Sequence, residues 1–180
     1  VITRLAVQKG VDLLFSTLPA LLATRDFELA VLGSGEPQYE AFFAGLARKY
    51  PDRVLFHRGF SDELAHWIEA ASDMFLMPSR YEPCGLNQMY SLRYGTVPIV
   101  RRTGGLADSV QHFDAASGTG TGIVFNDYNE AAVSWAINAA LDLYQHKGAW
   151  RRLVQNGMAQ DFSWTRQVQQ YVDAYERLAR

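Results

Sequence analysis

The chain is organised around MFLMPSRYEPCGL, residues 74–86. The apolar run 74–77 predicts a buried strand, and residues 87–94, closed by Gly95, predict a helix. The polar loop between them therefore joins the carboxyl end of a strand to a helix N-terminus, which is where ligands bind in open α/β sheets. Its last residues, Cys84, Gly85 and Leu86, can offer backbone N–H groups to an anion.

Strands and helices are predicted to alternate along nearly the whole chain. Further strands are expected at 1–2, 27–32, 53–57, 97–100 and 122–125, and helices at 11–22, 37–50, from 61, near 106, and at 129–146, 150–158 and from 164. This alternation predicts βαβ units, so the fold class is α/β, with a parallel sheet and helices on both faces. Pro19 is expected to kink or shorten its helix.

Composition limits the classes of function. The chain has 180 residues, 48% hydrophobic and 20% charged, which suits one globular domain. A net charge of −2 gives no reason to expect nucleic acid as a partner, and no apolar stretch is long enough to span a membrane. A single cysteine excludes an internal disulfide and suits a reducing compartment. The abrupt start at Val1 suggests a fragment of a longer protein.

Three loops at one sheet edge carry the polar residues of interest. They are the segment from Arg4 to Lys9, the loop with Arg80 and Glu82, and residues 101–105. Two cations near a helix N-terminus suit a diphosphate, although Arg4 and Lys9 could also be surface charges. Glu82 could accept hydrogen bonds or stabilise positive charge, and its alternative is a surface carboxylate paired with Arg80.

Other motifs favour structural interpretations. The glycines of Gly33-Ser34-Gly35 lack the third glycine of a dinucleotide fingerprint, so a plain turn is favoured. Cys84 has no histidine near it in sequence, which favours a packed thiol. The four histidines lack metal-ligand spacing, so no metal site is expected. The tryptophans are expected in the core, and Trp67 belongs to a predicted buried stripe with Leu64, Ile68 and Ala71. The residues alone therefore predict a parallel α/β domain that holds a nucleotide or a phosphate.

Two long motifs carry a family resemblance. Residues 78–90, PSRYEPCGLNQMY, and 94–110, YGTVPIVRRTGGLADSV, closely resemble the bacterial glycogen synthase and plant starch synthase family. Arg4-Leu5 with Gln8-Lys9-Gly10, and the segments 32–35 and 161–164, resemble further elements of that family. The resemblance covers essentially the whole chain.

The resemblance implies the GT-B architecture of two Rossmann-like domains. Residues 1–180 would be the C-terminal, nucleotide-sugar-binding domain, without the N-terminal acceptor domain, on which the final helix would pack. The family members are glycosyltransferases that move glucose from ADP-glucose to the non-reducing end of an α-1,4-glucan with retention. The fragment alone is expected to be inactive. Its location would be the cytoplasm of a bacterium or a plant plastid.

The resemblance also implies roles for individual residues. Glu82, Arg4 and Lys9 would be catalytic, and Arg4 and Lys9 would also hold the donor diphosphate. The further donor-binding residues would be Phe60, Cys84, Gly85, Leu86, Tyr90, Thr103 and Gly104. No cofactor or metal is expected, since the donor ADP-glucose supplies the sugar and ADP is the product. Tyr90 stands where related retaining transferases often carry a second glutamate, which argues against a two-carboxylate mechanism.

Two alternatives remain open. One is a UDP-glucose-dependent transferase of the same architecture. The other is a non-catalytic module that binds a nucleotide or a glucan. Intact Arg4, Lys9 and Glu82 argue against the second, because a decayed site would be expected to lose its charged residues first.

Overall fold

The computed structural model describes residues 1–179 and has an α/β fold with strands in two parallel sheets. In the first sheet, β1 (Leu29–Gly33) pairs with β2 (Val54–Arg58). In the second, β4 (Val97–Arg101) lies between β3 (Met74–Met77) and β5 (Ile123–Phe125). The N-terminal segment forms isolated parallel bridges, Ile2 with Leu32 of β1 and Leu5 with Gly35 just after β1.

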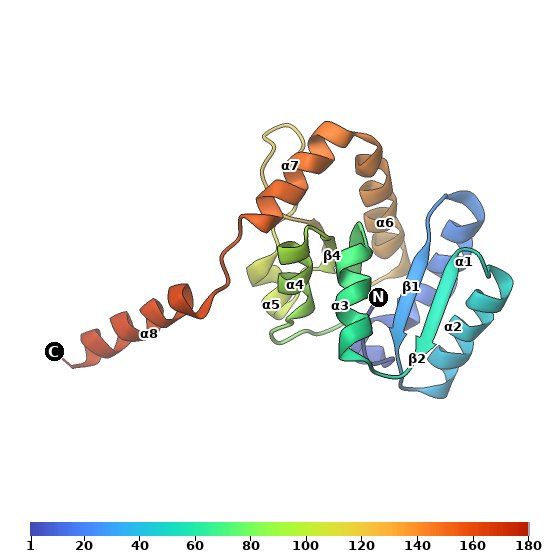
Figure 1. Ribbon diagram of the computed structural model, residues 1–180, viewed down its shortest axis with the longest axis horizontal. Coiled ribbons are helices and arrows are strands. Elements are labelled where there is room, and N and C mark those ends of the chain that lie inside the picture. Colours follow the sequence, from blue (N-terminus) through green and yellow to red (C-terminus); the bar gives the residue numbers. More distant parts are fainter. Residues whose placement is uncertain (180) are drawn as a thin grey trace.

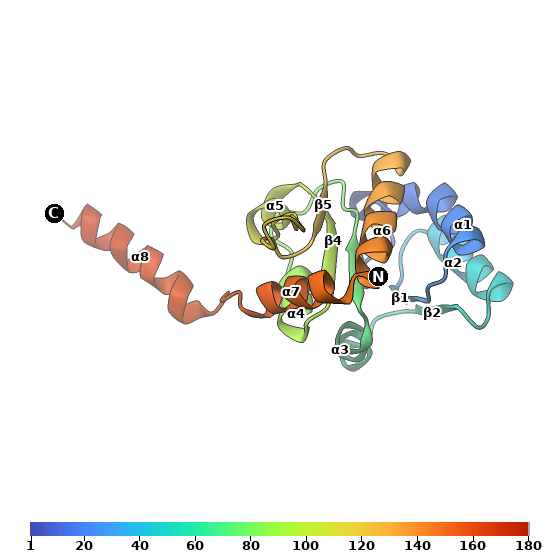
Figure 2. The same ribbon diagram turned by 90° about the horizontal axis from the view of Figure 1, so that it is seen from above.

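Helices surround both sheets (Figure 1). Two short 3-10 helices, η1 and η2, precede α1, and the others follow the strands in sequence. Their bounds are η1 Val7–Lys9, η2 Val11–Leu13, α1 Leu14–Thr24, α2 Pro37–Lys49, α3 Asp62–Ala71, α4 Asn87–Tyr94, α5 Gly104–Ser109, α6 Glu130–Gln145, α7 Lys147–Met158 and α8 Trp164–Leu178. Figure 2 shows α1 and α2 on one side of β1 and β2, with α3 on the other.

The predicted order of strands and helices is confirmed, with three differences. The helix predicted at 11–22 begins as η2, and α1 then continues through Pro19 to Thr24. The helices α5 and α7 each begin before the predicted residue, at Gly104 and Lys147. The sheet is also split: the strand expected at 1–2 forms only an isolated bridge to β1, and no ladder joins this segment to β3 within residues 1–179.

One hydrophobic cluster unites the two sheets. It contains buried side chains from α1, α2, α6 and all five strands, including Phe43, Leu76 and Ile137. The helix α6 contacts α1, β5 and α7, so it packs against elements of both halves. Burial of apolar surface on this scale is the main force that holds a domain together. The two sheets therefore belong to one folded unit.

The helix α3 begins as predicted but buries a different face. The Ser61 hydroxyl accepts a hydrogen bond from the Leu64 N–H at 3.2 Å, which confirms the expected N-cap. The Trp67 side chain is 66% exposed, whereas Ile68 and Glu69 are buried. Core placement is right for Trp150 and wrong for Trp67, Trp135 and Trp164, all of which are exposed. Helical spacing alone cannot decide between Trp67 and its neighbour Ile68 when both are apolar.

The final helix α8 extends away from the rest of the molecule (Figures 1 and 2). No residue of α8 is buried, and its predicted apolar face, which contains Val168, Tyr171, Val172, Tyr175 and Leu178, is exposed. The helix is therefore amphipathic, and its apolar face packs against nothing within residues 1–179.

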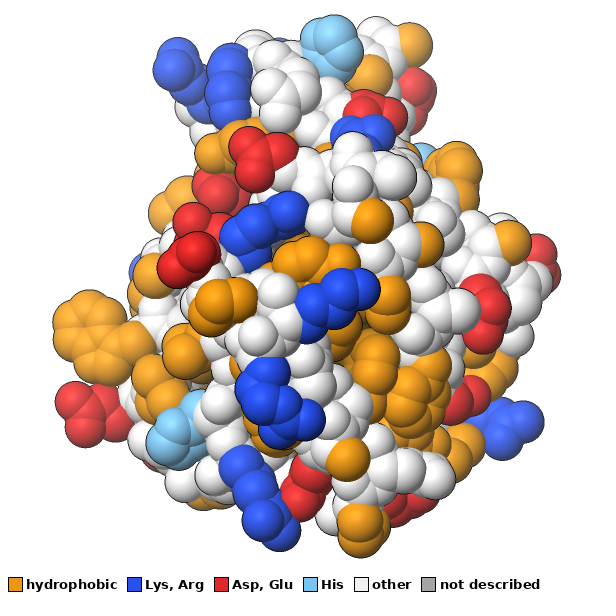
Figure 3. Space-filling model, turned by 90° about the vertical axis from the view of Figure 1, so that its right-hand side faces the viewer, with side chains coloured by type: hydrophobic (Ala, Val, Ile, Leu, Met, Phe, Trp, Pro, Cys, Tyr) orange, Lys and Arg blue, Asp and Glu red, His pale blue; other side chains and the backbone are white. Residues whose placement is uncertain are grey.

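The surface has no field of a single sign on the face that Figure 3 shows. At the end formed by α1, α2 and β2, Lys and Arg side chains lie among Asp and Glu side chains. This mixture fits the small net charge of −2. Among the described residues, none of the helices combines the length and apolar character needed to cross a lipid bilayer.

Candidate functional site

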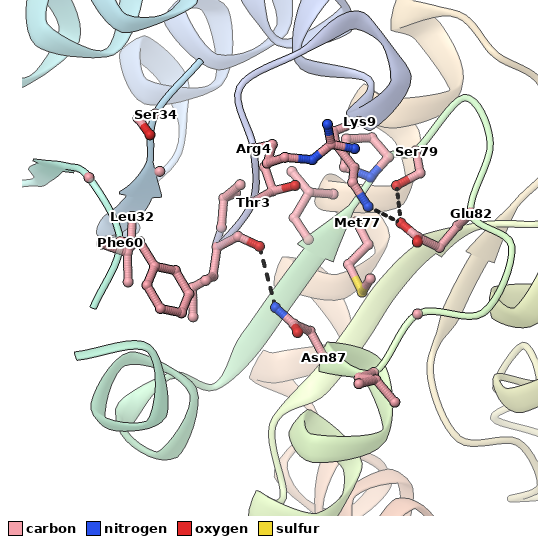
Figure 4. Close-up of a pocket in the computed structure, with 18 residues that line it drawn as sticks. Thr3, Arg4, Lys9, Leu32, Ser34, Phe60, Met77, Ser79, Glu82 and Asn87 are labelled. Atoms are coloured by element: carbon pink, nitrogen blue, oxygen red, sulfur yellow. Dashed lines mark hydrogen bonds and ion pairs between the residues drawn. The ribbon is translucent and has the colours of Figure 1, made fainter. Parts of the chain in front are cut away.

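A cavity of about 300 Å³ opens between the two sheets at the carboxyl ends of their strands. In doubly wound α/β folds this is the switch point where ligands bind. Figure 4 shows residues from the N-terminal segment, the end of β1 and the loop after β3 around it. The polar or functional side chains that line it include Thr3, Arg4, Lys9, Ser34, Phe60, Ser79, Glu82 and Asn87.

Lys9 and Glu82 form an ion pair in this cavity (Figure 4). The Lys9 Nζ lies 2.5 Å from Glu82 Oε2, and their side chains are only 19% and 8% exposed. The Ser79 hydroxyl donates a second hydrogen bond to the same oxygen at 3.2 Å. The alternative interpretation of Glu82 as a surface carboxylate paired with Arg80 is therefore wrong, because Glu82 is buried and Lys9 is its partner.

The segment that carries Arg4 and Lys9 is attached to the loop that carries Glu82. The exposed Arg4 donates from Nη2 to Gln8 Oε1 at 3.2 Å. The Gln8 carbonyl oxygen in turn accepts from the Arg80 N–H at 2.9 Å. Gly10 has φ +71°, and a Cβ there would clash with the Pro78 carbonyl oxygen. The backbones of the two loops are therefore in direct contact, and this contact fixes the separation of Lys9 and Glu82.

Tyr128, between β5 and α6, supports the same two loops. Its hydroxyl lies 2.6 Å from Asp12 Oδ1 and 3.3 Å from the Val7 carbonyl oxygen, and the shorter bond to Asp12 takes its single proton. The guanidinium carbons of Arg80 and Arg101 lie 5.2 and 5.4 Å from its ring centroid, in cation–π range. Burial, and then the bond to Asp12, raise the pKa of Tyr128. The residue therefore stays a neutral donor at physiological pH.

The loop before α4 presents backbone donors. Among residues 1–179, no acceptor bonds to the N–H groups of residues 85–88. Gln88, fully buried, donates from Nε2 to the carbonyl oxygens of Cys84 and Gly85 at 3.1 and 3.0 Å, which holds this loop in place. Free N–H groups at a helix start suit a negatively charged ligand.

The comparison with protein families is made on this geometry. The model of the family Glycosyl transferases group 1 matches residues 1–157. The chain belongs to this family. It is 56% identical over 178 residues to a glycogen synthase of Anaeromyxobacter sp. (strain K). The match covers 99% of this chain and 37% of that protein.

Solved structures agree with the family. The catalytic domain of Starch Synthase IV from Arabidopsis thaliana, bound to ADP and acarbose, matches with a TM-score of 0.86 and 37% identity, over 98% of this chain and 37% of that one. A C-terminal domain of a Glycosyl Transferase Group 1 Family Protein from Francisella tularensis shares the fold, with a TM-score of 0.61 and 20% identity over 87% of this chain and 80% of that one. The expected fold class, a Rossmann-like α/β domain of the GT-B kind, is confirmed. The chain spans 37% of the length of the curated glycogen synthase.

The group 1 fold brings together six of the ten predicted site residues. Arg4, Lys9, Phe60, Glu82, Gly85 and Leu86 line the cavity. Phe60 is 82% exposed, so its ring is available to a flat partner such as a base. The roles expected of these residues stay predictions.

The other four do not line the cavity. Cys84 is exposed, so the expectation of a packed thiol is wrong. Tyr90 is exposed on α4, with its ring centroid 6.0 Å from that of His66. Thr103 is the N-cap of α5, and Gly104 lies where a Cβ would clash with the Glu82 carbonyl oxygen. These two residues back the Glu82 loop, because the next residue, Gly105, donates its N–H to Glu82 O at 3.1 Å.

Sequence reasoning missed four polar residues of the cavity, which are Thr3, Ser34, Ser79 and Asn87. Ser79 could have been found from its position three residues before Glu82 in one short loop. Ser34 lies in the turn for which the sequence favours a structural role, and Asn87 donates from Nδ2 to the Ile2 carbonyl oxygen at 3.4 Å. Contacts between residues so far apart in sequence leave no local signal. Within residues 1–179, no group of three or more His, Cys, Asp or Glu side chains is placed to hold a metal ion.

Proposed function

We propose that this chain is the donor-binding domain of a glycogen or starch synthase. The full protein would transfer glucose from ADP-glucose to the non-reducing end of an α-1,4-glucan with retention of configuration. The observation that carries the proposal is one cavity in which Arg4 and Lys9 face Glu82 beside the free N–H groups of residues 85–88. The glycogen synthase and starch synthase relatives support it.

The cations suit the leaving group of this reaction. Departure of glucose from ADP-glucose leaves negative charge on the diphosphate. Arg4, Lys9 and the start of α4 provide positive charge and N–H donors for it. We therefore expect the donor to bind through these groups without a separate cofactor.

Glu82 suits the sugar end of the donor. A buried carboxylate accepts hydrogen bonds from hydroxyl groups, and it stabilises positive charge that develops at the reacting carbon. Its Oε1 accepts no hydrogen bond within residues 1–179, while Oε2 is held by Lys9 and Ser79. With Tyr90 eight residues further on, Glu82 would act without a second carboxylate at that position.

The remaining parts of the reaction lie outside this chain. Since it spans 37% of its curated relative, we expect an N-terminal domain of the same protein to supply acceptor contacts and to complete the catalytic site. The isolated chain should bind the donor but transfer nothing. Bacterial relatives support a cytoplasmic location.

Calorimetric titration of the 180-residue chain with ADP, UDP and ADP-glucose tests this function. We expect ADP to bind more tightly than UDP, and Lys9→Gln to weaken ADP roughly tenfold to a hundredfold, as expected for loss of a charged hydrogen bond. Lys49→Gln, on the last turn of α2, is the matched control and should bind as the original chain does. A preference for UDP would move the function to another group 1 transferase. Binding of a glucan without any nucleotide would favour the non-catalytic module.

A further inference from the structure

Lys9 and Glu82 form an ion pair with each other, although the proposed function assigns them to opposite ends of the donor. Lys9 would bind the diphosphate, and Glu82 would bind the glucose. Their ion pair measures 2.5 Å, and within residues 1–179 Lys9 is the one cation within 4.0 Å of Glu82. A diphosphate that takes Lys9 must therefore compete with this carboxylate.

Breaking such a pair is unfavourable because Glu82 is buried. A buried carboxylate that loses its cation keeps the desolvation penalty without the compensating attraction. Among the donors of residues 1–179, only the Ser79 hydroxyl, at 3.2 Å, would still donate to Oε2. A nucleotide diphosphate alone offers Glu82 nothing in return, since it is itself an anion.

A nucleotide sugar differs because its glucose carries hydroxyl donors. Glu82 lines the same cavity as Lys9, so glucose attached to the diphosphate can reach it. Those hydroxyl groups would replace the hydrogen bond that Glu82 loses when Lys9 moves to the diphosphate. The cost of separating Lys9 from Glu82 is then offset for the substrate but not for the product.

We propose that the Lys9–Glu82 ion pair makes this cavity discriminate between ADP-glucose and ADP. The inference rests on the proposed function and adds a mechanism of selectivity to it. After glucose has been transferred, Glu82 regains Lys9, and this competition promotes the release of ADP. Because the coupling is reciprocal, sugar contacts at Glu82 strengthen diphosphate binding at Lys9 by the same factor.

Glu82→Gln should therefore bind ADP more tightly than the original chain while binding ADP-glucose no better. We expect about a fivefold gain for ADP, within the range of interaction energies between residues in direct contact. Glu176→Gln on the exposed helix α8 makes the same charge change and should leave both affinities unaltered. Thermal unfolding of each variant checks that it is folded.

A double-mutant cycle separates competition from general repulsion. If Glu82 acts by occupying Lys9, the gain in ADP affinity from Glu82→Gln disappears in a Lys9→Met background. If Glu82 only repels the phosphates, the gain persists there, and the inference is wrong. It is equally wrong if Glu82→Gln leaves ADP affinity unchanged or weaker in a chain that binds ADP. A chain that binds neither ADP nor ADP-glucose would overturn the proposed function itself, and the inference with it.

Discussion

Gly10 holds the loop that carries Lys9 against the loop that carries Glu82. Its φ of +71° and the absence of a Cβ allow it to pass the Pro78 carbonyl oxygen. Gly10→Ala should lower the free energy of unfolding by about 2 kcal/mol or more, because it combines left-handed strain with a backbone clash. Urea unfolding measures this loss.

Gly45→Ala is the control for that substitution. Gly45 lies inside α2, where an added Cβ meets no atom within 4 Å. It should raise the free energy of unfolding by up to about 1 kcal/mol through helix propensity. Equal stability of the two variants would mean that neither the positive φ of Gly10 nor its approach to the Pro78 carbonyl oxygen excludes a Cβ there.

Tyr128 is a second residue whose substitution should change both the stability of the chain and the affinity of the cavity for ADP. Tyr128→Phe removes the 2.6 Å hydrogen bond to Asp12 while keeping the ring under Arg80 and Arg101. We expect a loss of about 1–3 kcal/mol of unfolding free energy, since a charged acceptor is left unpaired. ADP affinity should also fall, because Lys9 lies between Val7 and Asp12 in the attached loop.

Tyr175→Phe serves as the control for Tyr128→Phe, since Tyr175 is exposed on α8. Calorimetric denaturation and ADP titration of both variants measure the two effects. Unchanged ADP affinity in Tyr128→Phe would show that this residue stabilises the fold without positioning the cavity.

At the residue scale, the sequence predicts which residues lie in the cavity better than it predicts which of them contact one another. Arg4, Lys9 and Glu82 are predicted at one sheet edge because parallel strands end there, and the cavity contains all three. The Lys9–Glu82 pair joins residues 73 positions apart, so only the fold could reveal it. Arg80, the nearer cation in sequence, packs on Tyr128 instead.

The helix α3 contains a buried carboxyl that should make stability depend on pH. Burial raises the pKa of Glu69 from 4.5 to about 7. A carboxyl whose pKa is higher in the folded than in the unfolded state binds more protons when folded. Its contribution to stability is therefore complete below about pH 4.5 and is lost as the pH rises through about 7.

Glu69→Gln should remove this dependence, since a neutral amide stands for the protonated acid. The Tm of the variant minus that of the original chain should be larger at alkaline than at acidic pH. Burial also lowers the pKa of the Val1 amine to about 5, which acts in the opposite direction, and the charge of Glu69 counteracts that shift, so Glu69→Gln lowers the Val1 pKa further. A Tm difference that does not vary with pH would show that Glu69 does not titrate in this range.

At the element scale, the type of each element is predictable but the face that it buries is less so. Ser61, Asp62 and Glu63 mark the start of α3 by local chemistry, and the cap is present. The inward face is set by packing, which places Ile68 and Glu69 inside and leaves Trp67 exposed. Apolar spacing cannot foresee a buried glutamate.

For the whole molecule, the exposed face of α8 should dominate association in solution. Its Trp164, Tyr171, Tyr175 and Leu178 side chains are all more than half exposed, which is unusual for a stable monomer surface. Removing residues 164–180 should reduce self-association, measured by sedimentation velocity, because the apolar face is lost. Tm should change little, since no residue of α8 is buried.

Substitution of Tyr171 and Tyr175 by Asp tests the same face without shortening the chain. The substituted chain should behave as the shortened one does in sedimentation. A large fall in Tm in either variant would show that α8 packs on the domain.

At this scale the alternation of strands and helices correctly predicts a parallel α/β fold. It does not predict that the sheet is divided. The N-terminal segment forms bridges to Leu32 of β1 and to Gly35 just beyond it, whereas Ile2 accepts a hydrogen bond from Asn87 of α4 and pairs with no residue of β3 within residues 1–179. Register between strands that are distant in sequence depends on packing and not on local pattern.

Because the sheet is divided, a molecule bound in the cavity can connect its two halves. No ladder hydrogen bonds join β1 and β2 to β3, β4 and β5 within residues 1–179, and the cavity lies at that break. A bound molecule that contacts both sides opposes their separation, so its binding energy becomes cohesion between the two halves. Amide hydrogens in both sheets should then exchange with deuterium more slowly by a common factor, including amides far from any contact with the ligand.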